Sequence, residues 1–134
     1  MVKNLERLLG TSKTVDFTID ENLAWREDRE MEILELASTS GLCAQVFHVG
    51  YDLIQPYLDE EEISVVVEAN VRHLLPIRVG EAVAVGVKVI GVVENKIKLR
   101  GVVMKGEKKI LEMEFVRAVI SRNYLRRTAL EKTT

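Results

Sequence analysis

A histidine lies at the end of a stretch whose alternation is typical of a half-buried β-strand. In "SVVVEANVRH" (residues 64–73), one side of the strand carries, in order, Val65, Val67, Ala69, Val71 and His73. The opposite side carries Glu68, Asn70 and Arg72. Because successive side chains of a strand point to opposite faces, this parity predicts that His73 points inward. An imidazole titrates near neutral pH, so an inward His73 has the chemistry of a general base.

An arginine repeats this pattern on the last predicted strand. One face of that strand carries Leu111, Met113, Phe115, Arg117 and Val119. A guanidinium buried without a partner costs several kcal/mol, so an inward Arg117 predicts a paired acid, a set of carbonyl acceptors, a ligand or a wet cleft. The alternative for each residue alone is that its strand reaches the sheet edge, where the side chain extends to water. Two such residues together favour a polar site.

The segment that would position these side chains is a long apolar helix. "TSGLCAQVFHVGYDLIQPYL" opens with two N-cap candidates, Thr39 and Ser40, and its helical pattern ends at Pro56. The helix is apolar nearly all round, which predicts burial. Its polar stripe faces either a partner subunit or a water-filled cleft and consists of Gln45, His48, Asp52 and Gln55. Thr39 is therefore a plain cap, a site hydroxyl, or both.

Alternating runs at 63–74, 80–91, 96–105 and 108–121 predict an antiparallel meander after the helix. A short helix over 3–10 and a strand over 13–19 precede it, and the tail 125–134 is expected to fray. The segment 21–37 has no clear assignment. One buried helix beside long antiparallel strands predicts an α+β domain, spanning 1–134, whose sheet curls around the helix.

Composition narrows the classes of function. A net charge of −2 gives no basic field, so we expect neither a nucleic-acid partner nor a membrane partner. There is no apolar run of about 20 residues and no signal-peptide pattern, so we expect a cytoplasmic protein. Cys43 is the only cysteine and is expected to be a structural thiol. His48 and His73 lack a cluster of further ligands, which predicts no metal site. Phosphate loops, dinucleotide fingerprints and nucleophile elbows are absent.

Over most of residues 14–124 the sequence resembles the hotdog-fold thioesterases, and among them the fluoroacetyl-coenzyme A thioesterase group. The resemblance is carried by "ASTSGLCAQVFHVGYDLIQPYL", "VRHLLPIRVGEAVAV" and "FVRAVIS". It implies a hotdog fold, a long central helix wrapped by a curved antiparallel sheet. It also implies a homodimer with the sheets joined edge to edge, an acyl-coenzyme A substrate and no separate cofactor, since coenzyme A is part of the substrate.

The same resemblance assigns roles to individual residues. The catalytic threonine and histidine of the family fall on Thr39 and His73, and its late arginine falls on Arg117. Two positions depart from the pattern, because the family's helix glutamate falls on Phe47 and a glycine near the thioester carbonyl falls on Val66. We therefore expect Thr39 and His73 to be catalytic, and Phe47, Val66 and Arg117 to bind substrate. Without the glutamate, the family reaction does not transfer unchanged.

These inferences support one leading hypothesis and two rivals. The first is an acyl-coenzyme A thioesterase acting on a small acyl thioester at a dimer interface. The second is a non-catalytic acyl-coenzyme A binding or sensing protein, for which the missing carboxylate is the argument. The third, a structural dimer without ligand, leaves the inward His73 and Arg117 unexplained. Candidates for the phosphates of coenzyme A, or for plain solvated surface, are Arg72, Arg78, Arg126 and Arg127. We expect Thr39, His73 and Arg117 to converge on one cavity.

Overall fold

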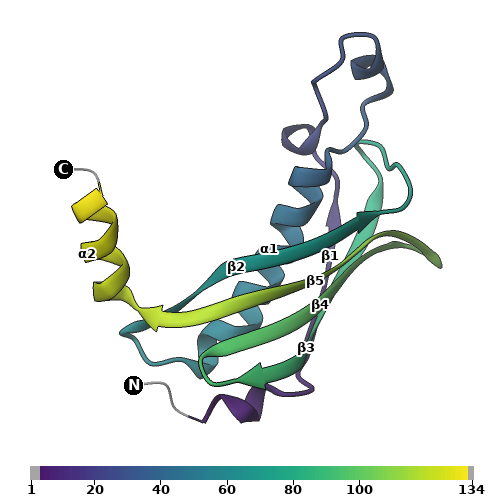
Figure 1. Cartoon of the computed structure of the whole chain (residues 1–134). Helices are drawn as coiled ribbons and strands as arrows, with labels where there is room; N and C mark the ends of the chain where they lie inside the picture. Colours follow the sequence, from purple (N-terminus) through teal and green to yellow (C-terminus); the bar gives the residue numbers. More distant parts are fainter. Residues whose placement is uncertain (1–3, 133–134) are drawn as a thin grey trace.

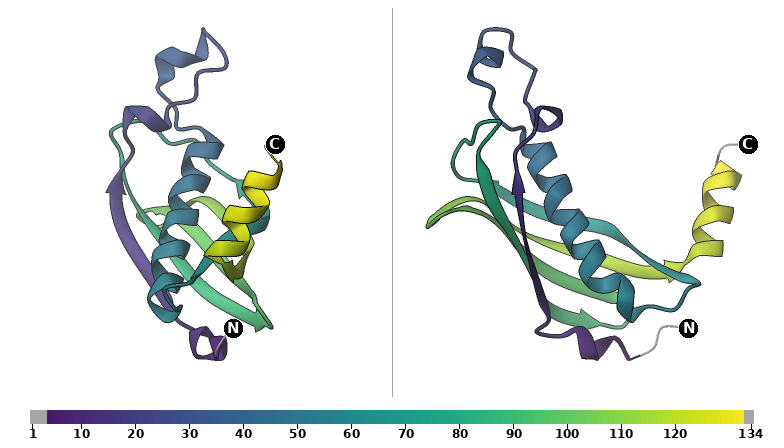
Figure 2. Two further views of the ribbon diagram at one scale, coloured as in Figure 1. Left: turned by 90° about the vertical axis from the view of Figure 1, so that its left-hand side faces the viewer. Right: turned by 180° about the vertical axis from the view of Figure 1, so that it is seen from behind.

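The computed structural model describes residues 4–132, in which one long helix lies across the concave face of a single curved sheet (Figures 1 and 2). The sheet comprises β1 (Ser12–Thr18), β2 (Glu62–His73), β3 (Ala82–Val93), β4 (Lys96–Lys105) and β5 (Lys108–Ser121). The helices are α1 (Thr39–Ile54), α2 (Arg122–Lys132) and the short 3-10 turns η1 (Leu5–Leu8), η2 (Glu21–Leu23), η3 (Met31–Leu34) and η4 (Gln55–Tyr57). The strand order is β1-β3-β4-β5-β2, and every neighbouring pair is antiparallel. The predicted α+β class is confirmed, and β3, β4 and β5 form the predicted antiparallel meander. The prediction that the strand before them, β2, opens this meander was wrong, because β2 pairs with β5 and not with β3.

The N-cap of α1 lies one residue before the first position that the sequence predicted. Ser38 is the N-cap, and its Oγ accepts a hydrogen bond from the N–H of Gly41 at 2.9 Å. The prediction that Thr39 or Ser40 caps the helix was wrong. The reason lies in the preceding chain, because the N–H of Ser38 donates to the carbonyl of Leu23 and holds that residue extended. Thr39 is therefore the first helical residue, and its hydroxyl is not used as a cap.

The core fills the space between α1 and the concave face of the sheet. Two glycines allow the helix to approach the strands closely. A Cβ at Gly50 of α1 would lie 2.9 Å from Phe115 Cζ, and a Cβ at Gly101 of β4 would collide with Val46. The largest fully buried side chains that meet there include Leu42, Val46, Ile54, Val85, Val89, Ile97, Leu99, Leu111 and Phe115. This packing fixes where both ends of α1 lie over the sheet.

A β-bulge interrupts β2 and changes the parity of its side chains. Val66 pairs with Arg117 of β5, but the next pair is Glu68 with Val116, so Val67 is the extra residue. Val67 is 53% exposed, and the prediction that it faces the core was wrong. Two other residues were predicted to face the core: Val65 is half-buried, and Ala69 is exposed. From residue 70 to the end of β2 the parity holds, since Val71 packs against the core and His73 is half-buried, whereas Asn70 and Arg72 are exposed.

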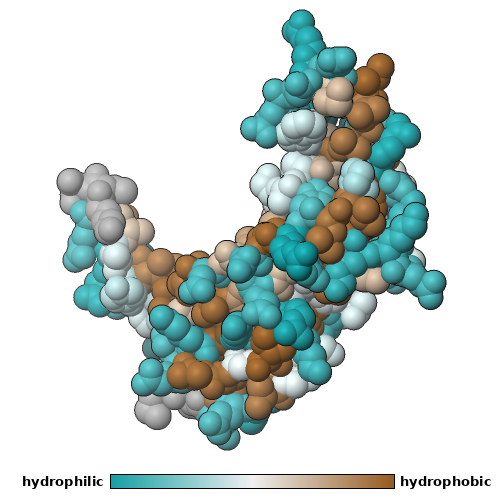
Figure 3. Space-filling model, turned by 45° about the vertical axis from the view of Figure 1, so that its right-hand side comes forward, coloured by the Kyte–Doolittle hydropathy of each residue, from teal (hydrophilic) through white to brown (hydrophobic). Residues whose placement is uncertain are grey.

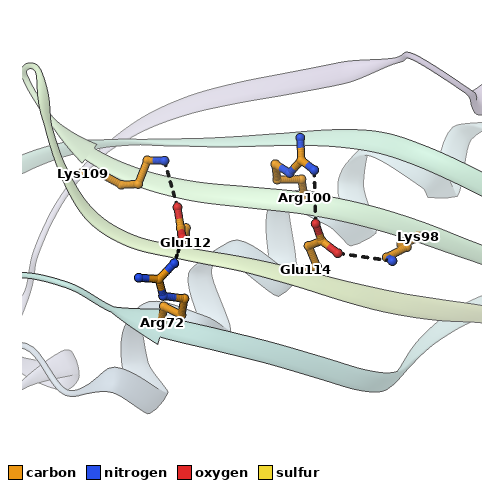
Figure 4. A network of polar contacts seen from close by, with 6 residues as sticks. All are labelled: Arg72, Lys98, Arg100, Lys109, Glu112 and Glu114. Atoms are coloured by element: carbon orange, nitrogen blue, oxygen red, sulfur yellow. Dashed lines mark hydrogen bonds and ion pairs between the residues drawn. The ribbon is translucent and has the colours of Figure 1, made fainter.

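The parity predicted for β5 is confirmed along its length. Its inward residues are at most 5% exposed: Leu111, Met113, Phe115, Arg117 and Val119. Arg117 is thus a buried charged side chain in the middle of the strand, opposite α1. The charged residues of the other face, among them Glu112 and Glu114, point away from the helix (Figure 4).

Two segments project from this body. Residues 20–38, which we call the arm, carry η2 and η3 and are anchored by the isolated bridges Ala24–Ala37 and Leu36–Arg78. At the opposite end of β2, α2 extends from β5 and continues to Lys132, past residue 125 where fraying was expected. Figure 3 shows an open notch between these two projections.

Lys3 of the expected 3–10 helix and tail residues 133–134 lie outside the described residues. No helix within 4–132 is long and apolar enough to cross a membrane.

Candidate active site

The first residue of α1 and the last residue of β2 meet in a hydrogen bond. Thr39 Oγ1 lies 2.7 Å from His73 Nδ1. The two residues are 34 positions apart in the sequence, so the contact depends on how α1 sits over the sheet. Because Ser38 caps the helix, the Thr39 hydroxyl is available to the imidazole. The structure therefore brings together the two residues that the resemblance marks as catalytic.

The other ring nitrogen of His73 is enclosed. Its Nε2 is buried from solvent and has no hydrogen-bond partner among residues 4–132. A buried polar nitrogen without a partner costs free energy, of the order of 1–3 kcal/mol. A buried polar atom without a partner is uncommon in a native protein, and a catalytic role is one explanation for it. The imidazole is thus held through Nδ1 alone.

Two hollows flank the Thr39–His73 pair. The deeper has a volume of about 420 Å³ and is lined by Trp25, Glu27, Leu36, Ala37, Ser38, Thr39, Ser40, His73 and Pro76. The second, of about 380 Å³, is shallower and is lined by Thr39, His73, Leu74, Leu75 and Pro76. The arm forms one wall of the deeper hollow, which we call the cavity. The pair is therefore accessible to a small molecule from both sides.

The N-terminus of α1 opens into the same cavity. The N–H of Gly41 is bound by Ser38 Oγ, and that of Leu42 by the carbonyl of Ser38. The N–H groups of Thr39 and Ser40 have no acceptor within the described part of the chain. Unpaired N–H groups and the helix dipole give this end a partial positive charge. Negative charge that develops beside Thr39 is therefore stabilised.

Arg117 lies elsewhere, against the middle of α1. Its Nη1 donates to the carbonyl of Ser64 at 2.9 Å and to Ser64 Oγ at 3.1 Å, and its Nη2 donates to the carbonyl of Phe47 at 2.8 Å. The guanidinium also lies 5.6 Å from the centre of the Tyr51 ring. Burial lowers the pKa of Arg117, and the nearby Tyr51 and Asp52 oppose that shift. Of the alternatives that the sequence left open for Arg117, the structure shows the set of carbonyl acceptors.

The expected site residues thus form two groups within one chain. Phe47 packs edge-on against Phe115, with ring centres 5.3 Å apart, and Val66 pairs with Arg117. Neither Phe47, Val66 nor Arg117 lines the cavity beside Thr39. Phe47 follows Thr39 by eight residues, or about 12 Å along the helix at 1.5 Å per residue. The convergence of Arg117 with Thr39 and His73 was expected and does not occur within a single chain.

Sequence reasoning missed the contribution of the arm. Trp25 and Glu27 line the cavity, and the indole Nε1 of Trp25 donates to Glu27 Oε1 at 2.7 Å. Trp25 is the only tryptophan in the chain, and its place in a polar, unassigned segment was the available signal.

No group of three or more potential metal ligands occurs among the described residues. Burial raises the pKa of the single thiol, Cys43, on the buried side of α1.

The fold is shared with known hotdog proteins. A hot-dog-like protein from Thermanaerovibrio acidaminovorans superposes with a TM-score of 0.90 at 20% identity, covering 98% of each chain. The fluoroacetyl-CoA thioesterase FlK superposes with a TM-score of 0.86 at 23% identity, covering 94% of this chain and 97% of its own. A hypothetical protein of the thioesterase superfamily from Thermus thermophilus gives 0.84 at 14% identity, with 93% and 92% covered. The predicted hotdog fold is confirmed.

The sequence itself defines the family. The family model for the fluoroacetyl-CoA-specific thioesterase, FlK, matches residues 19–123. The chain therefore belongs to the FlK thioesterase family, as the resemblance predicted. Variants of FlK have been crystallised with fluoroacetate and CoA and with acetyl-CoA. No curated protein sequence matches the chain significantly.

Proposed function

We propose that this protein is an acyl-CoA thioesterase that hydrolyses a small acyl thioester at the Thr39–His73 pair. The observation that carries the proposal is the 2.7 Å hydrogen bond between Thr39 Oγ1 and His73 Nδ1 beside a cavity, in a chain of a thioesterase family. A hydroxyl bound to an imidazole is the arrangement that moves a proton away from an attacking oxygen. It needs no metal ion and no separate cofactor.

In the proposed reaction, Thr39 and His73 act as a proton relay. With the ring proton on Nε2, Nδ1 accepts from the Thr39 hydroxyl, whose oxygen in turn accepts from a water molecule in the cavity. As the water oxygen bonds to the thioester carbon, its proton passes to Thr39 Oγ1 and the Thr39 proton passes to His73 Nδ1. When the carbon–sulfur bond breaks, the proton returns along the same path to the departing thiolate. General-base help of this kind contributes roughly 10²–10⁴ in rate.

The head of α1 supplies the second element of the mechanism. The unpaired N–H groups of Thr39 and Ser40 belong to residues that line the cavity, and in the proposed reaction they would face the carbonyl oxygen as it becomes negative. Fixed donors of this type stabilise a developing oxyanion, and they need no reorganisation during the reaction. This contribution comes from the backbone and is independent of the residue at position 47.

Position 47 bears on the mechanism through its distance from the pair. At about 12 Å along the helix from Thr39, a side chain at 47 meets a Thr39–His73 pair only if it belongs to another subunit. In this chain that side chain is Phe47, which can line an acyl pocket and cannot act as nucleophile or base. We therefore assign the base to His73 alone, and substrate contacts to Phe47 and Val66.

We also propose a homodimer joined along β2, which is one edge of the sheet. β2 has 12 residues, whereas β1 at the other edge has seven. Its free side is an open row of backbone donors and acceptors, and Val67 beside it is 53% exposed. Pairing with a second β2 would satisfy these groups and would cover Val67. It would also bring the two α1 helices onto one face of a continuous sheet.

The test is hydrolysis of a panel of short acyl-CoA esters together with equilibrium binding of CoA. We expect His73→Ala to lower kcat/KM by roughly 10²–10⁴-fold, and Thr39→Val to lower it less. His48→Ala is the matched control, because His48 is exposed on α1 and is expected to leave the rate unchanged. Unchanged turnover in His73→Ala would overturn the proposed mechanism.

A second function, acyl-CoA binding or sensing without turnover, is favoured by the absence of a carboxylate at position 47. In that case the wild type binds CoA or a stable acyl-CoA analogue and hydrolyses none of the panel. His73→Ala would then change affinity without any rate to lose. The same two measurements therefore separate the two functions.

A further inference from the structure

The helix α2 has no core contact of its own in the described structure. Its apolar side chains are open to water, with Tyr124 53% exposed, Leu125 39% and Leu130 60%. It stands away from α1 beyond the end of β5, as Figures 1 and 2 show. An isolated helix of 11 residues is marginal in water, so a helix of this length is normally stabilised by packing. Within residues 4–132, no surface covers the apolar side chains of α2.

The position of α2 relative to β2 identifies that surface. Ser121, the last residue of β5, pairs with Glu62 at the start of β2. The next residue, Arg122, opens α2, and its N–H donates to the carbonyl of Glu61 at 2.8 Å. His73 lies at the opposite end of β2 and the arm lies beside it. α2 and the cavity are therefore at opposite ends of the same edge strand, on either side of the notch in Figure 3.

Antiparallel pairing of two β2 strands would bring the α2 of one copy close to the cavity of the other. When the strands overlap along their length, the start of one lies opposite the end of the other. The α2 of the second copy would then stand beside the cavity and the arm of the first. By symmetry the same contact occurs twice.

Charge complementarity supports this placement. The arm's carboxylates are Asp20, Glu21, Glu27, Asp28, Glu30, Glu32 and Glu35, and its cations are Arg26 and Arg29. α2 has the opposite balance, with Arg122, Arg126, Arg127 and Lys132 against Glu131. An acidic projection beside the cavity of one copy would therefore meet a basic helix from the other.

The cavity lacks what a coenzyme A ester needs. Its lining in the described structure contains Glu27 and no lysine or arginine. Two nearby cations are already engaged, since Arg78 Nε donates to the carbonyl of Leu34 at 2.9 Å and Arg72 Nη1 contacts Glu112 at 3.0 Å. The arm's own Arg26 and Arg29 do not line the cavity and are outnumbered by the arm's seven carboxylates. Arg126 and Arg127 form no ion pair with another residue of 4–132. They lie within the first two turns of α2, at the end nearest the partner's cavity.

We infer that α2 of each subunit crosses to the second copy and places Arg126 and Arg127 at the mouth of its Thr39–His73 cavity, where they bind the phosphates of the coenzyme A moiety. This inference rests on the proposed function. Guanidinium groups suit phosphate oxygens because they donate two parallel hydrogen bonds with charge. The cavity of one chain is incomplete without the helix of the other.

The first experiment compares substrates with and without phosphates. We expect Arg126→Gln/Arg127→Gln to raise KM for an acyl-CoA ester roughly tenfold or more, because two charge-assisted contacts are lost. KM for the matching acyl-N-acetylcysteamine thioester, which has no phosphate, should not change. Lys13→Gln/Lys88→Gln is the matched control, because it removes two exposed cations from β1 and β3 at the far edge of the sheet. Equal KM changes for both substrates, or none, would overturn the inference.

The second experiment tests whether the arginines act across the dimer. His73→Ala subunits carry an intact α2, and Arg126→Gln/Arg127→Gln subunits carry an intact Thr39–His73 pair. Mixed dimers should regain activity with the wild-type KM, although neither homodimer shows it. If the arginines served their own subunit, mixing would restore nothing and the inference would fail.

Two further outcomes are distinguishable. If the arginines only pair with the partner's arm, the double variant dissociates more readily in sedimentation without a change in the KM ratio, which contradicts phosphate binding. If the wild type hydrolyses no thioester, the proposed function fails, and calorimetric binding of CoA against pantetheine still tests the arginines. Loss of the preference for CoA in the double variant would then support the inference by itself.

Discussion

The two faces of the β2–β5 pair hold arginine in opposite ways. On the outer face, Arg72 Nη1 lies 3.0 Å from Glu112 Oε2, and Lys109 Nζ lies 2.9 Å from the other oxygen of the same carboxylate (Figure 4). Beside them, Arg100 and Lys98 share Glu114 at 3.1 and 3.2 Å. On the inner face, Arg117 is 5% exposed, and it donates hydrogen bonds to two backbone carbonyls and one hydroxyl.

The comparison shows that the side chains with the most ion pairs contribute least to the stability of the fold. The outer pairs are surrounded by water, which screens them, so each contributes little to the free energy of unfolding. The inner guanidinium has lost its water, and its neutral acceptors belong to β2 and α1, which it therefore ties together. Removing it would take away the donor to the Ser64 carbonyl and hydroxyl and would cut the link from β5 to the Phe47 carbonyl of α1. Three variants test this contrast.

The largest effect is expected from Arg117→Ala. The change leaves a cavity under α1 and removes three hydrogen bonds to Ser64 and Phe47, while relief of the guanidinium's desolvation offsets part of the loss. We expect the free energy of unfolding to fall by about 3 kcal/mol, measured by urea unfolding at fixed protein concentration. A loss below about 1 kcal/mol would mean that the desolvation cost nearly cancels the hydrogen bonds.

A smaller effect is expected from Arg117→Lys. The ammonium keeps the charge and its desolvation but lacks the fork that reaches Ser64 and Phe47 together. We expect about half the loss seen for Arg117→Ala, roughly 1–2 kcal/mol, in the same urea measurement. Arg72→Lys on the outer face is the matched control and should be nearly neutral. If both lysine variants behave alike, the fork of Arg117 has no special importance.

The smallest effect is expected from Glu112→Gln/Glu114→Gln. The hydrogen bond from Lys109 lowers the pKa of Glu112, and the hydrogen bonds from Arg100 and Lys98 lower that of Glu114, below the ordinary value of 4.5. A carboxyl whose pKa is lower in the folded state stabilises the fold above its unfolded pKa, and this contribution is lost as the pH falls through the folded pKa. At pH 7 the variant should unfold almost like the wild type.

Acid unfolding provides the sharper readout for this variant. Below about pH 4.5 the wild type should lose stability more steeply than Glu112→Gln/Glu114→Gln, and 1 M salt should reduce the difference. The measurement is urea unfolding at pH 7 and at several values from 5 to 3. Parallel pH profiles would show that the outer pairs contribute nothing in water.

The sequence predicted most of the fold because its periodic signals are strong. Alternation in β3, β4 and β5 and the apolar run of α1 were sufficient to assign these elements, and the inward side of Arg117 followed from parity. Parity predicts which face of the sheet a side chain lies on, but not where on that face. The sequence therefore could not show that Arg117 and His73 lie far apart. That separation follows from the 12 Å of helix between Thr39 and Phe47, which only the assembled structure relates to the sheet.

The rest of the site depended on contacts between distant segments. Ser38 is the cap because the carbonyl of Leu23 holds its N–H, and no local pattern reports that bond. The bulge at Val67 has no marker such as glycine, so Val65 and Val67 were assigned to the wrong side. Trp25 and Glu27 reach the cavity through bridges that close the arm, in a segment without periodicity.

The bulge in β2 also restricts which strands can join this edge. One extra residue bends β2 and shifts its backbone groups out of regular spacing, so a straight strand from an unrelated protein can match only half of the edge at a time. In the proposed dimer, a copy of the same strand turned through a two-fold axis would bring an identical irregularity to this edge. The bulge would then favour pairing with a second copy over pairing with an unrelated strand.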